Sequence, residues 1–118
     1  MRILDVDQIP PAQAGQLTGH LVEGEAVYAA FRAPTGAILF TDRRIVVAQR
    51  EHLLEVRIET SSWPYRAVRH FSIQEAESAD SRAAMRIWLG DEAHPLHLRA
   101  NPGTDLRALQ GLLAGKLL

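Results

Sequence analysis

Two short apolar runs separated by a polar corner constrain this chain more than any other feature of its sequence. The runs are residues 37–40 and 45–48, which contain several β-branched and aromatic side chains, and the corner between them reads Thr-Asp-Arg-Arg. Short runs of this kind around a polar break are typical of an antiparallel β-hairpin. The pattern predicts a fold built on strands, but it does not reveal which ligand or reaction the chain serves.

Strand-like segments continue on both sides of this hairpin at short and regular spacing. The expected strands are residues 26–32, 37–41, 44–49, 54–60, 68–75, 83–89 and 95–99. Polar residues, glycines and prolines separate them, which indicates an antiparallel barrel or sandwich rather than a fold of alternating strands and helices.

The two ends of the chain are expected to be helical. A short helix is expected between residues 9 and 21, where Pro10 or Pro11 can start it. A longer helix is expected after residue 104, because its leucines fall on one stripe that can be buried. These leucines are Leu106, Leu109, Leu113 and Leu117. We therefore expect a helical segment over residues 1–24 and a single domain over residues 25–118.

Composition limits the classes of function. The chain has 118 residues, no cysteine and a net charge of -1. The length suits one domain with its own core, and the lack of cysteine excludes disulfides and thiolate chemistry. No signal peptide or membrane-spanning run is recognisable, so a soluble, cytoplasmic protein is expected. The near-neutral charge gives no overall attraction to nucleic acid or to an anionic membrane.

Several short motifs occur in the same order as in a known family. They include Val22-Glu23-Gly24-Glu25-Ala26-Val27, Leu39-Phe40-Thr41-Asp42-Arg43-Arg44-Ile45, Pro64-Tyr65 and Ile87-Trp88. On these motifs the sequence resembles the bacterial pleckstrin-homology-like (PH-like) domain family, over about residues 21–118. The resemblance implies a mainly β fold, in which seven antiparallel strands form a partly open barrel capped by a C-terminal helix. It also implies a protein without catalytic activity that assembles into oligomers.

The alternation of side chains along each strand sorts residues onto two faces. In residues 83–89 the apolar set faces the core, so Arg86 and Trp88 point outward, and His97 is expected to point outward from residues 95–99. The first three strands are apolar on both faces. We therefore expect a second apolar surface, covered by the N-terminal segment, by another subunit or by a protein partner. The candidate interface residues for a homo-oligomer are Tyr28, Leu39, Val46, Arg86 and Trp88.

The sequence offers no catalytic or metal-binding constellation. No serine lies in a nucleophile elbow, and neither phosphate-loop nor dinucleotide-binding glycine motifs occur. His94 and His97 lie three residues apart on an expected strand, so they face opposite sides and cannot share one ion. We expect no catalytic residue, no metal site and no cofactor, although an enzyme of unrecognised type remains an alternative.

One group of cations is a candidate for binding an anion. Arg32 borders the first hairpin loop, and Arg50 and His52 follow the third expected strand, which ends on the same side of the barrel. Such groups form charge-assisted hydrogen bonds with phosphate. The main hypothesis is thus a homo-oligomeric interaction module without catalysis. The alternative is weak binding of anionic lipid headgroups or phosphorylated peptides at the open end of the barrel. Membrane contact is possible on this alternative, but the charge does not support it.

Overall fold

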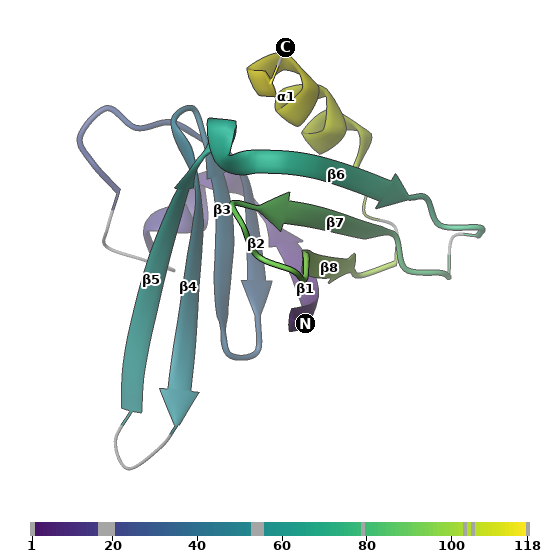
Figure 1. The fold of residues 1–118 in the computed structure, drawn as a ribbon. Coiled ribbons are helices and arrows are strands. Elements are labelled where there is room, and N and C mark those ends of the chain that lie inside the picture. Colours follow the sequence, from purple (N-terminus) through teal and green to yellow (C-terminus); the bar gives the residue numbers. More distant parts are fainter. Residues whose placement is uncertain are drawn as a thin grey trace. The chain divides into compact units, whose positions relative to one another are not determined.

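Eight strands, two 3-10 helices and one α-helix make up the described part of the chain (Figure 1). The computed structural model describes residues 2–16, 21–52, 56–78, 80–102, 104 and 106–117. They group into two compact units, one of Met1–Val6 with Pro64–Leu118 and the other of Asp7–Trp63. The boundary expected after residue 24 therefore falls inside the second of these units.

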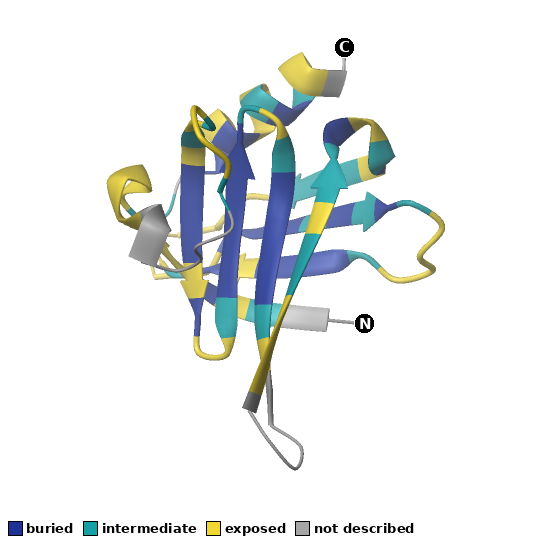
Figure 2. Cartoon of the chain, turned by 90° about the vertical axis from the view of Figure 1, so that its left-hand side faces the viewer, coloured by how far each residue is buried: buried dark blue, intermediate teal, exposed yellow. Residues whose placement is uncertain are grey.

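The unit of residues 7–63 is an antiparallel sheet. Its elements are η1 (Pro11–Gln16), β2 (Val27–Ala33), β3 (Gly36–Thr41), β4 (Arg44–His52) and β5 (Val56–Pro64), together with the end of β1 (Arg2–Ile9). Neighbouring strands follow the order β5-β4-β3-β2-β1. Buried residues are concentrated along β2, β3 and β4, whereas β5 is largely exposed (Figure 2). The four strands from β2 to β5 lie close to their predicted positions.

The other unit combines three antiparallel strands, the start of β1 and the C-terminal helix. Its further elements are η2 (Tyr65–Ala67), β6 (Val68–Gln74), β7 (Ala84–Leu89), β8 (Leu96–Ala100) and α1 (Arg107–Leu117). The strand order is β1-β8-β7-β6, and β1 runs parallel to β8. The three strands and the helix agree with the prediction.

The strand β1 was not predicted, because the first 24 residues were expected to be helical. Its start pairs with β8 and its end pairs with β2, where Ile9 lies opposite Ala30. A signal was present in the sequence, since Leu4 and Val6 alternate with Asp5 and Asp7. The expected helix is limited to the 3-10 turn η1, and residues 17–20 lie outside the described residues.

The predicted leucine stripe accounts for the burial of α1. Leu106, Leu109 and Leu113 are buried, while the side chain of Leu117 lies outside the described residues. The helix contacts η2, and the Lys116 ammonium lies 5.9 Å from the centre of the Tyr65 ring. None of the described helices has the length and apolar character required to span a membrane.

The polar corner between β3 and β4 is tied to the segment that precedes β2. The Arg44 guanidinium donates hydrogen bonds of 2.9 and 3.0 Å to the two carboxylate oxygens of Glu25, and the Thr41 hydroxyl donates another of 2.6 Å. The backbone N–H of Ala26 donates to Asp42. The hydrogen bonds from Arg44 lower the pKa of Glu25 to about 2, although burial acts in the opposite direction. Glu25 is therefore a carboxylate at neutral pH, and two of the quoted motifs meet here.

Candidate functional site

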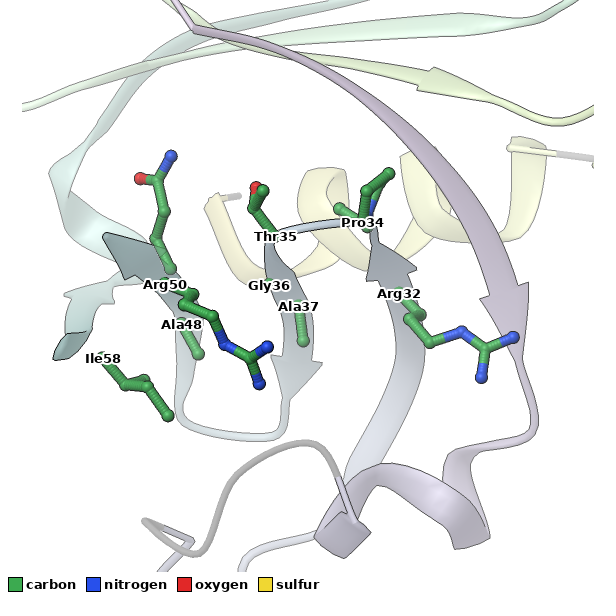
Figure 3. Close-up of a pocket in the computed structure, with 10 residues that line it drawn as sticks. Arg32, Pro34, Thr35, Gly36, Ala37, Ala48, Arg50 and Ile58 are labelled. Atoms are coloured by element: carbon green, nitrogen blue, oxygen red, sulfur yellow. The ribbon is translucent and has the colours of Figure 1, made fainter. Parts of the chain in front are cut away.

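A pocket of about 260 Å³ lies beside the β2–β3 hairpin, entirely within the unit of residues 7–63 (Figure 3). It is lined by Arg32, Ala33, Pro34, Thr35, Gly36, Ala37, Ala48, Gln49, Arg50 and Ile58. The lining comes from the hairpin, from the end of β4 and from β5. The pocket therefore depends on four strands, β2 to β5, that are brought together by the sheet.

Small residues leave the space that the pocket occupies. Ala37 lies between Arg32 on β2 and Ala48 on β4, so the three residues share one face of the sheet. Both alanines are buried and offer only a methyl group each. Gly36 is packed so closely against β4 that an added Cβ would collide with the carbonyl oxygen of Ala48. The backbone N–H of Arg50 donates a 2.6 Å hydrogen bond to the Thr35 carbonyl, which fixes the hairpin against β4.

The structure places two of the three predicted cations around this pocket. Arg32 and Arg50 both line it, and both side chains are exposed. In Figure 3 the Arg50 guanidinium lies beside the two alanines, whereas the Arg32 side chain points away from them, toward β1. His52 is the last residue of β4, and its side chain lies outside the described residues. Arg50 thus places its guanidinium beside the small apolar floor, and Arg32 lies at one edge of the pocket.

Several lining residues were not singled out from the sequence, Thr35 and Ile58 among them. Thr35 is an exposed hydroxyl in the hairpin turn, and Ile58 is 63% exposed on β5. Nothing in the sequence near Ile58 marks it as a ligand contact, because its position depends on the register of β5 with β4. Thr35 lies within the predicted loop, so its place in the pocket follows once the loop is recognised.

The second apolar face of the first strands is covered by the chain itself. Leu39 and Val46 are 1% and 0% exposed, and with Ala30 they form a buried cluster. Ile9, Leu21 and Val27 pack against that cluster. Of the three covers expected for this face, the N-terminal part of the chain therefore provides it at these positions, through side chains of β1, of the segment before β2 and of the start of β2. Leu39 and Val46 have no accessible surface with which to meet another subunit.

The remaining interface candidates lie at the surface of the two units. Tyr28 is 51% exposed on β2, while Arg86 and Trp88 are half-buried on β7. Both β7 residues point away from the core, as predicted. The indole ring of Trp88 stacks on the exposed His70, with ring centroids 4.6 Å apart.

His97 departs from the expectation of an exposed side chain. It shares the outward face with Arg86, its register partner on β7, yet it is only 8% exposed. Neither ring nitrogen has a hydrogen-bond partner among the described residues. Burial lowers the pKa of His97, and the nearby charges of Arg86 and Arg99 act in the same direction. In the described part of the chain, no three His, Asp or Glu side chains gather to hold a metal ion.

The structure is similar to solved structures of bacterial PH-domain proteins. A DUF1696 family protein with a pleckstrin-homology domain from Shewanella loihica matches with a TM-score of 0.76 at 23% identity, over 97% of this chain and 98% of that one. A PH-domain protein from Exiguobacterium sibiricum matches with a TM-score of 0.77 at 15% identity, over 96% of this chain and 62% of that one. At such identities the likeness shows a shared fold, which is mainly β and PH-like.

Sequence comparison leads to the same family. The uncharacterized Bacillus subtilis protein YjqA is 31% identical over 80 residues, which are 68% of this chain and 64% of the relative. The chain therefore spans just under two thirds of the length of that relative. Residues 5–117 match the family described as the bacterial PH domain, which confirms the resemblance in the sequence motifs. Because this match extends over almost the whole chain, the protein belongs to the bacterial PH domain family.

Proposed function

We propose that this chain is a non-catalytic PH-like binding module that holds a phosphate-bearing ligand in the pocket beside the β2–β3 hairpin. The observation that carries the proposal is the presence of Arg32 and Arg50 around one pocket. Guanidinium groups form forked, charge-assisted hydrogen bonds with phosphate oxygens. A lipid headgroup and a phosphorylated side chain both offer this chemistry.

The rest of the lining favours a ligand with a carbon skeleton over a bare ion. The methyl groups of Ala37 and Ala48 and the exposed side chain of Ile58 give apolar contacts, and Thr35 adds a hydroxyl. A pocket of about 260 Å³ is near the small end of the range for ligand sites. The net charge of -1 means that attraction of the anion depends on the two local arginines.

Binding measurements on matched variants test this proposal. Vesicles containing a phosphatidylinositol phosphate and a soluble phosphoserine peptide are titrated separately at low salt, with phosphatidylcholine vesicles and the unphosphorylated peptide as blanks. We expect Arg32→Gln and Arg50→Gln each to weaken binding roughly tenfold, because each removes charge-assisted hydrogen bonds. Arg43→Gln, an exposed change at the opposite turn of the β3–β4 hairpin, should leave binding unchanged.

The two arms distinguish the source of the phosphate. Binding to the vesicles alone indicates a headgroup, and binding to the phosphopeptide alone indicates a protein ligand. Absence of binding to both probes would remove the proposal. An equal loss in Arg43→Gln would show a general charge effect instead of a pocket.

A second candidate function is self-association through exposed side chains. Tyr28 and Val22 are large apolar residues with about half of their surface exposed, although Leu39 and Val46 no longer support this hypothesis. Aromatic residues concentrate in the centres of protein interfaces. Light scattering behind a sizing column at several concentrations tests it: an oligomer in the parent that Tyr28→Glu dissociates would support it, and a monomer at all concentrations would contradict it.

A further inference from the structure

The outward face of the β6–β8 sheet carries two arginines and an aromatic stack. Its side chains are His70, Ser72, Arg86, Trp88, His97 and Arg99. They share one face because His70 lies opposite Trp88, Ser72 opposite Arg86 and Arg86 opposite His97 in the strand registers. This face lies wholly within the unit that contains β6, β7 and β8, which are neighbours in Figure 1.

The acidic side chain on this face already pairs with an arginine. Asp5 on β1 lies opposite Arg99, and its two oxygens accept hydrogen bonds of 2.8 and 3.0 Å from the Arg99 guanidinium. The other register positions on β6 and β7 are Gln74 and Ala84. Among the described register positions of this face on β6, β7, β8 and the start of β1, Asp5 is thus the single carboxylate, and it pairs with Arg99.

Arg86 has no such partner. The residue is half-buried, and its guanidinium makes no hydrogen bond or ion pair with any described residue; the same holds for the indole N–H of Trp88. Beside it, both ring nitrogens of His97 are buried without a partner among the described residues. The nitrogens of Arg86 and Trp88 are not among the described atoms that are buried without a partner, so they reach solvent. Arg86 can therefore bind a group of another molecule, and its guanidinium suits a carboxylate.

An aromatic stack of His70 and Trp88 lies next to Arg86 on this face. The His70 and Trp88 rings are 4.6 Å apart and nearly parallel, with an angle of 19° between their planes. Trp and Arg are the residues that most often dominate binding energy at protein interfaces. An open sheet face suits an extended segment that brings an acidic and an apolar side chain together.

We infer that this face binds an acidic segment of a partner protein, with a carboxylate on Arg86 and a neighbouring apolar side chain on the Trp88–His70 stack. The carboxylate accepts hydrogen bonds from the Arg86 guanidinium, for which no described residue provides an acceptor. The complementarity of charge selects an acidic partner, because the face carries Arg86 and Arg99 and its carboxylate Asp5 pairs with Arg99. This site is separate from the Arg32–Arg50 pocket, which lies in the other unit.

An NMR titration tests the inference directly. The probe is acetyl-Gly-Glu-Phe-Glu-Gly-amide, and the matched probe replaces both Glu residues with Gln. The indole N–H resonance of Trp88, assigned by its absence in Trp88→Phe, is followed in the labelled protein. We expect a saturable shift with the acidic peptide and roughly tenfold weaker binding of the Gln peptide, since the charge-assisted hydrogen bonds are lost.

Variants locate the contact on the face. Arg86→Gln should weaken binding of the acidic peptide roughly tenfold, whereas Arg82→Gln, an exposed change just before β7, should not. Well-dispersed amide spectra establish that each variant is folded. Arg86→Lys keeps the positive charge but cannot donate two parallel hydrogen bonds to a carboxylate, so its affinity for the acidic peptide should lie between those of Arg86→Gln and Arg82→Gln. The Arg32→Gln/Arg50→Gln double variant should bind the acidic peptide like the parent, whatever it does to phosphate ligands.

Three results would overturn the inference. The first is the absence of a saturable shift up to the solubility limit of the peptide. The second is equal binding by Arg86→Gln and Arg82→Gln. The third is an identical shift with inorganic phosphate at the same ionic strength, which would mean that the face binds any anion and does not recognise a protein segment.

Discussion

The carboxylate of Glu25 shows how much a single residue contributes to the fold. Its side chain is fully buried and paired with Arg44, whose side chain is partly exposed. We expect Glu25→Gln to lower the free energy of unfolding at neutral pH by about 3 kcal/mol, because the change leaves a partly buried guanidinium without its counter-charge. Urea denaturation measures this, with the exposed Glu23→Gln as the matched control. Equal stability of the two variants would show that the pair contributes little.

The same carboxyl makes stability sensitive to acid. The pKa of Glu25 is lowered from 4.5 to about 2 by its hydrogen bonds in the folded state. The unfolded chain therefore takes up this proton at a higher pH than the folded protein, so the contribution is complete above pH 4.5 and is lost as the pH falls towards 2. Between pH 4.5 and 2 the free energy of unfolding should therefore fall less in Glu25→Gln than in the parent protein.

His97 acts in a higher range of pH. Burial, followed by the charges of Arg86 and Arg99, lowers its pKa below the usual 6.5, and Asp5 opposes this. The unfolded chain binds the proton first as the pH falls through 6.5, so the free energy of unfolding decreases on acidification. We expect a smaller decrease between about pH 7.5 and pH 5.5 in His97→Leu than in the parent, measured by urea titration. His94→Leu, a change at an exposed histidine, should keep the decrease of the parent.

Among the elements, β1 links features that are far apart in the sequence. Val6 is buried, whereas Asp5 on the other face is paired with Arg99, and both members of that ion pair are 47% exposed. We expect Val6→Ala to lower the free energy of unfolding by about 2 kcal/mol through loss of buried methyl groups. Asp5→Asn should cost less than about 1 kcal/mol, because exposed ion pairs contribute little. Denaturant titrations of both variants measure the two losses of stability. A larger loss in Asp5→Asn than in Val6→Ala would contradict this account of β1.

The elements also show how far local patterns predict structure. From Val27 to Ala100 the strands follow the short apolar segments and the polar, glycine or proline residues between them. The leucine stripe fixes α1, because burial of a helix face depends on spacing along the chain. A signal in β1 was present as well, namely the alternation of apolar and acidic residues, but Pro10 and Pro11 suggested a helical start. Its parallel partner β8 lies at the other end of the chain, and no local pattern specifies such a pairing.

At the scale of the whole molecule, the burial of the second apolar face changes what the variants should do. Leu39→Glu and Val46→Glu each place a carboxylate in a buried cluster, which costs several kcal/mol unless the charge is paired. We expect both variants to be unfolded by circular dichroism, whereas Tyr28→Glu, at an exposed position, should remain folded. A folded Leu39→Glu protein with an altered oligomeric state would restore the interface hypothesis for this face.

The sequence alone determined the mainly β class, seven strand positions, the C-terminal helix and the family, since these depend on periodicity and on ordered motifs. It also predicted Arg32 and Arg50 as candidates for binding an anion, because cations at a hairpin loop and at a strand end can be recognised from the sequence. Only the tertiary structure decided that Ile58 joins them, that the chain covers Leu39 and Val46 itself, and that His97 is buried beside Arg86. These facts depend on which strands become neighbours, and long-range pairing brings together residues whose proximity no local pattern records.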